Sequence, residues 1–482
     1  MACCKCTDVE FEWPDPQMPI YTDKQGDEYC VFHAPIDKKD ISVEEFNQLI
    51  FDRINKSKKE CILSNVVFPG DISFLEFSKG EIFPGLTLPG AIFHGEADFS
   101  RITFNEELFM VGAIFHKEAN FFGSTFNSCA GFLDVKFKGE SSFNGITFND
   151  DCYYSESEFF GSSIFNFSKF NGPTSFNKTK FNEEVQYYRT EFRGDLDATM
   201  SQYRGEAKYE YAIFTCAALF NASSFYGAAN FSASQFNSDV NFNEVEFYDV
   251  TLFRNCIFNK MAYFISATFN KLVDFSYAIA NNNSLLLHQL TGNSLASINF
   301  IISSSYMFSF KSCQWPEKLY LENNEYKFQD CAELYRGLKQ KAASEHDQPM
   351  VSKWHYREKL MALKQLKEKR GWWHIFSMTW LYHAFSGFGE KPGWAGAWLL
   401  GVVFGPLLFL IIRAFLQTGF SSSFDPEKTA EVFTYWLRCI PFIRQDASSM
   451  GIGGQLGAGL MQILIALQAA LFGFALRNKF RR

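Results

Sequence analysis

Large hydrophobic residues recur at alternating intervals of five and six residues through the middle of the chain, from Phe93 to Phe275. A small or β-branched residue stands two positions before most of them, as Ala97 stands before Phe99. This spacing matches neither the 3.6-residue period of a helix nor the two-residue period of a strand, so it indicates a structural repeat. The pattern is weak at one place, around Ala198–Tyr209, which predicts either a kink or a binding site.

The repeat predicts a β-solenoid. Four sides of five and six residues give a coil of 22 residues, so residues 93–275 make about eight coils. The large residues and their small partners share the interior, where the aromatic rings stack as ladders. The Asn, Asp, Ser, Thr and Gly residues between them suit tight turns. We expect irregular first coils from residue 61 and degraded last coils to about residue 325.

Segments such as "GEADFSRITF", "KEANFFGSTF" and "YGAANFSASQF" resemble the pentapeptide-repeat family. The resemblance implies the family's fold, a right-handed quadrilateral β-helix. This chain departs from the usual family pattern, because its central residue is mostly Phe rather than Leu and alternate steps have an extra residue. The fold that the resemblance implies does not specify an activity.

Composition and motifs narrow the functional classes. The net charge of the 482 residues is −8, so we expect no broad basic surface and no nucleic-acid partner. The sequence has no G-x-S-x-G, no G-x-x-x-x-G-K-[ST] and no H-E-x-x-H, so we expect no enzyme. The twelve cysteines lack the spacing of a secreted disulfide framework, and no apolar run opens the chain. We therefore expect a reduced, cytoplasmic environment for the repeat.

A possible zinc site lies near the N-terminus. Cys3 and Cys6 form a C-x2-C pair, and Cys30 and His33 form a C-x2-H pair. These ligand types and spacings suit a tetrahedral structural zinc ion with no open position for catalysis. Cys4 could replace Cys3 or Cys6, and the alternative is a set of unrelated reduced cysteines.

Helices are predicted on both sides of the solenoid. Residues 40–56 form an amphipathic helix with capping-box spacing between Ser42 and Glu45, which would cover the first coil. Residues 329–345 and 349–369 read as a helical pair. This pair resembles the helices that follow the repeats in membrane-bound pentapeptide proteins.

Two uncharged runs, 392–412 and 447–476, are long enough to cross a hydrocarbon core of about 30 Å. The small residues Gly453, Gly457 and Gly473 would allow close helix packing in the membrane. Basic segments, "KQLKEKR" and "RNKFRR", flank the pair, so we expect the solenoid and the C-terminal tail in the cytoplasm. The run "FSGFGEKP", two spans and "ALRNKFRR" resemble the end of membrane-anchored pentapeptide-repeat proteins in bacteria. That resemblance implies the bacterial inner membrane.

The segment between the spans allows two interpretations. A short helix there could be re-entrant and line a pore through Trp436, Arg438, Pro441 and Arg444, or the segment could lie on the outer membrane face. No potassium-type Thr-Val-Gly-Tyr-Gly filter is present. The predicted organisation is 1–60, zinc-knuckle-like segment and capping helix; 61–325, β-helix; 326–371, helical pair; 372–391, interfacial helix; 392–416, first span; 417–451, loop; 452–476, second span; 477–482, basic tail.

Three functions are compatible with this organisation. The favoured one is a membrane-anchored scaffold or sensor that binds a cytoplasmic protein partner through its β-helix. The alternative is a homo-oligomeric ion channel or membrane-permeabilising effector, for example in phage defence, with a tetramer favoured if the spans form a pore. The third is a DNA mimic that binds gyrase, which the membrane tether and the mixed charges of the outer face disfavour.

Overall fold

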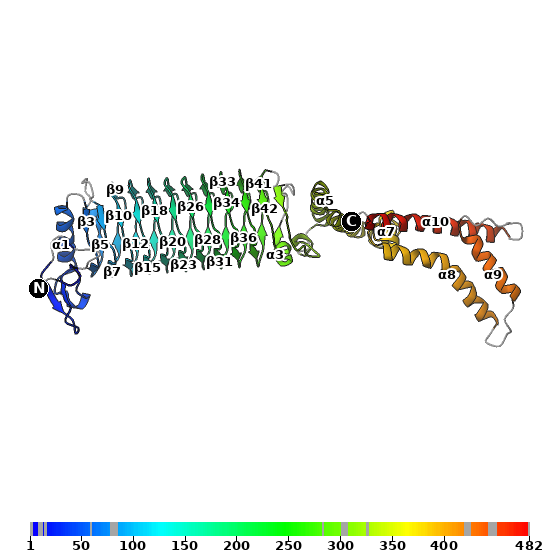
Figure 1. Ribbon diagram of the computed structural model, residues 1–482, viewed down its shortest axis with the longest axis horizontal. Coiled ribbons are helices and arrows are strands. Elements are labelled where there is room, and N and C mark those ends of the chain that lie inside the picture. The colour runs from blue at the N-terminus through cyan, green and yellow to red at the C-terminus, as the bar shows by residue number, and fades with distance from the viewer. Residues whose placement is uncertain are drawn as a thin grey trace. The chain divides into compact units, whose positions relative to one another are not determined.

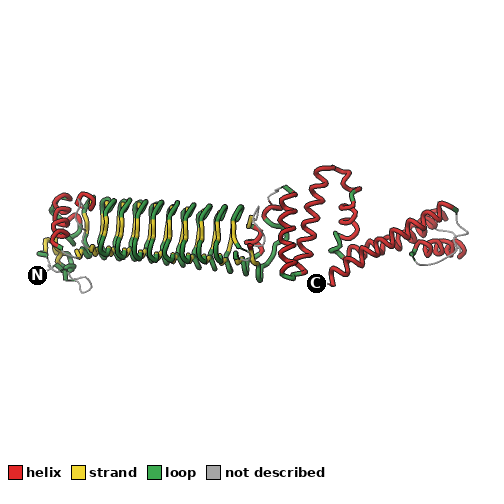
Figure 2. Tube along the Cα trace, turned by 90° about the horizontal axis from the view of Figure 1, so that it is seen from above, coloured by secondary structure: helices red, strands yellow, loops and turns green. Residues whose placement is uncertain are grey.

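The computed structural model describes residues 3–7, 13, 17–57, 60–77, 85–281, 284–299, 307–323, 327–418, 426–441 and 451–480. The chain divides into two compact units, Met1–Asn323 and Asn324–Arg482. The first contains stacked short strands, and the second is helical (Figures 1 and 2).

The first unit is a β-solenoid of about ten turns, as the repeat predicts. Four parallel sheets of 12, 10, 11 and 9 strands form its sides. Strand β11 (Ile114–Phe115) pairs with β7 (Ile92–Phe93) and with β15 (Lys136–Phe137), so each residue lies beside the residue 22 positions away. The four sheets run from β3 (Glu60–Ile62) to β44 (Phe308–Ser309), from β4 (Val67–Phe68) to β39 (Thr268–Phe269), from β5 (Ile72–Ser73) to β43 (Ile298–Asn299), and from β9 (Thr103–Phe104) to β41 (Ile279–Ala280).

Aromatic rings fill the interior of the solenoid. The rings of Phe93 and Phe115 stack with centroids 4.5 Å apart and planes 3° apart. Across the interior, the rings of Phe121 and Phe132 meet edge to face at 5.5 Å. Both arrangements are favourable for aromatic quadrupoles, and all four rings are completely buried. The core is therefore the predicted set of aromatic ladders.

The extra residue in alternate steps belongs to a left-handed corner. Measured from the start of one strand to the start of the next, steps of six and five residues alternate, as from β8 (Ala97–Asp98) to β9 and from β9 to β10 (Leu108–Phe109). Each six-residue step between strand starts contains one residue with positive φ, for example Arg101, Gly112 and Gly123, and these corners recur every 11 residues. The five-residue steps between them contain no such residue in the part of the solenoid that the structure describes. A left-handed corner thus lets this chain depart from a strict five-residue pattern while every ring still faces inward.

The weak part of the repeat is not a kink. Strand β26 (Leu196–Asp197) pairs in the regular register with β22 (Thr174–Ser175) and β30 (Ala218–Leu219). The interpretation of this stretch as a kink is therefore wrong. The difference is confined to the interior, where Ala198 takes the place of a ring.

A small N-terminal module covers the first coil. It consists of a hairpin, β1 (Pro19–Thr22) and β2 (Glu28–Cys30), the short helix η1 (Ile36–Lys38), and α1 (Val43–Lys56). Helix α1 has the predicted capping box between Ser42 and Glu45. Its buried Phe46 meets Phe68 of the first coil edge to face at 5.9 Å. Helix α1 therefore closes the end of the aromatic core, as expected of a cap.

The last coils are irregular. Helix α3 (Gly292–Ala296) lies between β42 (Leu285–Leu286) and β43, and α4 (Tyr320–Asn323) follows β44. Within the described residues the strands end at residue 309, earlier than the expected 325.

The second unit is a set of helices. Helices α5 (Phe328–Ser344) and α6 (Gln348–Arg370) form the predicted pair. The expected helix at 372–391 is instead η3 (Gly371–Phe376) and α7 (Met378–Ser386), because Ser377 caps α7 and Gly387 ends it with a left-handed residue. The remaining helices are α8 (Pro392–Thr418), α9 (Pro426–Cys439) and α10 (Ile452–Phe480). Within α8 and α10, Pro392–Phe409 and Ile452–Phe480 are long and apolar enough to cross a membrane.

Candidate functional site

The structure brings Cys3, Cys6, Cys30 and His33 together in the N-terminal module. Their ligand atoms all lie within 4.8 Å of one another, and all four residues are buried. The sulfurs of Cys6 and Cys30 are 3.8 Å apart, and Nδ1 of His33 is 3.2 Å from the Cys30 sulfur. Thiolates 2.3 Å from one tetrahedral zinc ion would be about 3.8 Å apart, so this arrangement fits a metal ion.

Two tight turns present these ligands. The amide of Cys6 donates to the carbonyl of Cys3, at 3.0 Å, and the amide of His33 donates to that of Cys30, at 3.1 Å. The amide of Cys4 donates to the carbonyl of Glu28, at 2.8 Å, which joins the first turn to the hairpin. Cys4 itself is not a member of the cluster, although the sequence alone allowed it.

A carbonyl of the first coil orients the histidine. Nε2 of His33 lies 2.9 Å from the carbonyl oxygen of Ser64, so it donates there and leaves Nδ1 to face the sulfurs. The indole of Trp13 donates to the hydroxyl of the same Ser64, at 2.8 Å. The cluster is therefore attached directly to the solenoid.

The electrostatics of the cluster favour a thiolate at Cys3, whereas hydrogen bonds with Cys3 and Cys30, together with burial, raise the pKa of Cys6. Hydrogen bonds from the thiols of Cys30 and Cys6 lower the pKa of Cys3, despite its burial. Burial lowers the pKa of His33, but hydrogen bonds to the sulfurs of Cys3 and Cys30 outweigh it and raise that pKa to about 9. The thiolate of Cys3 thus faces a protonated His33, and a bound metal ion would take the place of the protons.

Sequence reasoning missed a buried lysine beside the cluster. The ammonium of Lys39 donates to the carbonyls of Val31 and Phe32, and it lies 4.6 Å from the ring centre of Phe46. Burial lowers its pKa to about 7, while the thiolates of Cys30 and Cys3 act in the opposite direction. Three thiolates with a divalent ion carry one negative charge, and Lys39 is placed to balance it. Nothing in the local pattern "DKKD" distinguishes Lys39 from its neighbour.

A second group of candidate residues lies where α9 packs between α8 and α10. The indole of Trp436 in α9 donates to the carbonyl of Val403, at 2.7 Å, close to Pro406 in α8. The amide of Gln462 in α10 donates to the carbonyl of Arg438 near the end of α9, at 2.6 Å. The second contact satisfies a carbonyl in the last turn of α9, where no intrahelical N–H is available. Pro441 follows α9, whereas Arg444 lies outside the described residues.

The three glycines predicted to pack spans differ in their surroundings. A Cβ atom on Gly457 would lie 3.1 Å from the Tyr435 hydroxyl of α9, so Gly457 allows α9 to approach α10. A Cβ atom on Gly453 or Gly473 would meet nothing within 4 Å in the described part of this single chain. A packing role for Gly453 and Gly473 against another copy stays a prediction.

Two amides of α10, which sequence reasoning also missed, attach it to α7, to the loop after α7 and to the start of α8. The buried Gln468 donates to the carbonyls of Phe385, at 3.0 Å, and Ala395, at 2.8 Å. Asn478 donates to the carbonyl of Gly389, at 3.0 Å. Interhelical amide bonds of this kind are favourable where water is scarce. In the sequence, Gln468 is visible only as a polar residue inside an apolar run, and Asn478 only as one polar residue of the basic tail.

Comparison with known proteins identifies the repeat. Residues 242–285 match the family model for pentapeptide repeats (9 copies). No curated protein and no solved structure matches the chain. The matched residues lie inside the solenoid, whose earlier coils pair in the same 22-residue register.

Proposed function

We propose that this chain, a pentapeptide-repeat β-helix protein, is a membrane-anchored scaffold or sensor whose solenoid binds a cytoplasmic protein partner. The observation that carries the proposal is the union, in one chain, of a long solenoid with two helices that are apolar enough to cross a membrane. Aromatic rings fill the interior of the solenoid, so binding takes place on its outer surface.

The basic residues beside the two spans support a solenoid that lies in the cytoplasm and is anchored to the bacterial inner membrane by the spans. Lys367, Lys369 and Arg370 end α6 before the first span, and Arg477 and Lys479 end α10. Positive residues beside spans favour the cytoplasmic side. Both ends of the hairpin then lie inside the cell, and the bilayer is the first partner of the chain.

The N-terminal cluster is proposed to hold zinc. Three cysteines and one histidine form a closed donor set that suits tetrahedral zinc, and metal ions that prefer six or more oxygen ligands, such as magnesium and calcium, fit it less well. Because all four positions are taken by side chains, the ion would stabilise the cap rather than catalyse a reaction. Its contribution would be to hold the N-terminal module against Ser64 of the first coil.

An exchange of anchors tests the scaffold proposal. Residues 392–480 are replaced by an unrelated two-helix anchor of the same topology, and a proximity-labelling enzyme is fused to the N-terminus. If the spans serve only to locate the solenoid at the membrane, the chimera labels the same neighbouring proteins as the wild type. Loss of those neighbours in the chimera, at equal expression and with intact membrane insertion, would refute the proposal.

A pore is the second candidate, and the position of α9 favours it. Trp436 and Gln462 hold α9 against both spans, which is expected of a re-entrant helix and not required of a surface loop. A single hairpin cannot enclose a pore, so this function needs a ring of copies, most simply a tetramer. Reversing the charge of Arg438 or Arg444 would then alter ion flux in liposomes. Unchanged flux in both variants would exclude the pore.

The outer face argues against a DNA mimic. Lysines pair with carboxylates from coil to coil, as in Lys178–Glu156, at 3.2 Å, and Lys271–Asp249, at 2.8 Å. A mimic of DNA needs uncompensated negative charge along one face. We therefore give gyrase binding the lowest place among the three functions.

A further inference from the structure

Three consecutive corners on one edge of the solenoid carry large side chains. Phe167, Arg189 and Tyr211 follow one another at 22-residue intervals, with φ of 57°, 53° and 57°. On the same edge, earlier coils place Gly123 and Gly145. Phe167 is 53% exposed and Tyr211 is 51% exposed, so neither ring contributes to the core. Bulky residues are uncommon at positive φ, and packing of the fold does not account for them here.

These residues form one continuous patch with Tyr188. The guanidinium carbon of Arg189 lies 5.4 Å from the ring centre of Tyr188 and 5.7 Å from that of Tyr211. The ring of Tyr188 meets that of Phe167 at 5.5 Å and that of Tyr211 at 5.6 Å, both edge to face. Arg189 is thus held by aromatic rings before any ligand arrives, which lowers the entropy lost on binding.

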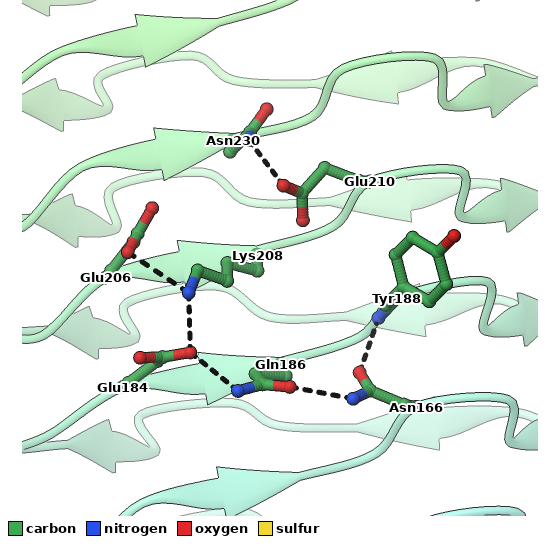
Figure 3. A network of polar contacts seen from close by, with 8 residues as sticks. All are labelled: Asn166, Glu184, Gln186, Tyr188, Glu206, Lys208, Glu210 and Asn230. Carbon is green, nitrogen blue, oxygen red and sulfur yellow. Dashed lines mark hydrogen bonds and ion pairs between the residues drawn. The ribbon is translucent and has the colours of Figure 1, made fainter.

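A polar network beside the patch fixes the backbone of Tyr188 (Figure 3). The amide of Tyr188 donates to the side-chain oxygen of Asn166, at 2.8 Å, and Asn166 donates to Gln186, at 2.7 Å. Gln186 in turn donates to Glu184, at 2.6 Å. Hydrogen bonds between two neighbouring coils therefore hold the backbone of Tyr188, and with it the attachment point of its ring, in place.

Lys208 and Arg193, two other cations of this region, are paired with carboxylates, whereas Arg189 is not in the part of the chain that the structure describes. Lys208 binds Glu184, at 2.7 Å, and Glu206, at 3.3 Å (Figure 3), and Arg193 binds Glu191, at 2.7 Å. Among the described residues, no carboxylate lies within 4.0 Å of the Arg189 guanidinium. Arg189 is thus a cation without a carboxylate partner in the described chain, and exposed aromatic rings surround it.

We propose that this aromatic–arginine corner, formed by Phe167, Tyr188, Arg189 and Tyr211, binds an acidic segment of the partner protein. The inference rests on the proposed scaffold function and names its binding surface. The planar guanidinium matches a carboxylate in geometry as well as charge, and Tyr and Arg are enriched among the residues that dominate protein interfaces. The exposed rings suit a large apolar or aromatic residue next to that carboxylate.

Peptide selection tests the proposal on the full chain in detergent. Random peptides of about a dozen residues, displayed on phage, are selected on the wild type and on variants of the corner. We expect enrichment of peptides in which Asp or Glu stands beside an aromatic or large apolar residue. Arg189→Glu and Tyr211→Ala should each reduce the binding of these peptides roughly tenfold or more.

The solenoid provides matched controls. On this edge, Tyr277 has φ of 60° and is 54% exposed three coils further on. On another edge, Arg204 is an exposed arginine that bonds to Asn182. Tyr277→Ala and Arg204→Glu should leave peptide binding unchanged. The proposal is overturned if no acidic peptides are enriched, or if the control variants lose binding as much as the corner variants do.

Other anionic ligands are tested in parallel. If Arg189→Glu abolishes binding to phosphatidylglycerol vesicles or to a DNA duplex while peptide binding persists, the corner does not bind a protein segment and the proposal fails. The anchor exchange leaves the corner intact. A chimera that keeps its neighbours while the selection fails would therefore refute the corner alone, whereas a chimera that loses them would refute the scaffold function.

Discussion

The hydroxyl groups of Tyr203 and Tyr209 lie 3.1 Å apart inside a core made mainly of phenylalanine rings. The coil register explains their position. Ala198 stands between Phe176 and Phe220 in the ladder, so one ring is missing there, and Tyr187 and Tyr209 are the rings that would face it from the neighbouring ladder. Polar atoms of buried tyrosines need partners. The hydroxyls of Tyr203 and Tyr209 pair with each other, whereas the buried hydroxyl of Tyr187 has no partner among the described residues.

Restoring the missing ring should destabilise the solenoid. Ala198→Phe adds a ring beside those of Tyr187 and Tyr209 in a closed core, and overpacking of this kind costs about 1–3 kcal/mol in the free energy of unfolding. Adding Tyr209→Phe should recover part of that loss, because it removes one hydroxyl from the crowded space. The measurement is the thermal midpoint of the full chain in detergent, followed by circular dichroism. An Ala198→Phe protein as stable as the wild type would show that the space is not filled.

Metal analysis tests the N-terminal cluster. We expect about one zinc ion per chain in protein purified without added metal, because the four ligands form a complete set. Cys30→Ser should remove the ion and lower the unfolding midpoint of the N-terminal module. Cys4→Ser is the matched control, since Cys4 neighbours the cluster without belonging to it. Equal zinc content in the wild type and Cys30→Ser would refute the site.

Acid should loosen the pair α5 and α6. Burial raises the pKa of Glu358, but bonds from Lys339, at 2.5 Å, and Arg336, at 3.1 Å, outweigh it and hold that pKa below its ordinary value. Below about pH 4.5, Glu358 takes up a proton more readily in the unfolded chain than in the folded one. The contribution of Glu358 to the free energy of unfolding is therefore complete above that pH and is lost as the pH falls through the folded-state pKa.

Hydrogen exchange of the α5 and α6 amides measures this effect. Exchange should accelerate on acidification, after correction for the intrinsic rate, and Glu358→Gln should remove most of the dependence. At neutral pH, Glu358→Gln should lower the free energy of unfolding by about 1–2 kcal/mol. The effect is this small because Arg336 is half exposed and water screens its charge. A pH dependence of equal size in both proteins would contradict this assignment.

Leucine substitutions separate the glycines of α10. Gly457→Leu should push Tyr435 away and weaken the packing of α9, at a cost of about 1 kcal/mol or more. Gly453→Leu should be tolerated in a single chain, because nothing lies within 4 Å of its Cβ position. The resistance of the detergent-solubilised protein to unfolding by SDS compares the two. If Gly453→Leu is the more harmful, α10 packs against another copy through that face.

The solenoid could be predicted because its pattern repeats many times. Each ring, small partner and turn residue repeats the same constraint every 22 residues, so single exceptions such as Ala198 do not obscure the coil. The capping box of Ser42 and Glu45 and the two apolar runs are local patterns that also determine their elements directly. The ligand spacing brought Cys3, Cys6, Cys30 and His33 into consideration, although only the structure distinguishes Cys3 from Cys4.

Contacts between distant single residues could not be predicted. Lys39, Gln462 and Gln468 each bond to backbone carbonyls, which every residue has, so no pairing pattern appears in the sequence. The aromatic–arginine corner was hidden for another reason. Tyr188, Arg189 and Tyr211 look like ordinary polar or turn positions until the 22-residue register stacks them.

The most direct test of the scaffold account is the mass of the detergent-solubilised particle, followed on the same sample by ion flux in liposomes. The account predicts a monomer or dimer that conducts no ions, with the solenoid as the functional surface and the membrane as its location. A ring of four or more copies that conducts ions would contradict it. The hairpin would then be a pore, and the solenoid would be its sensor.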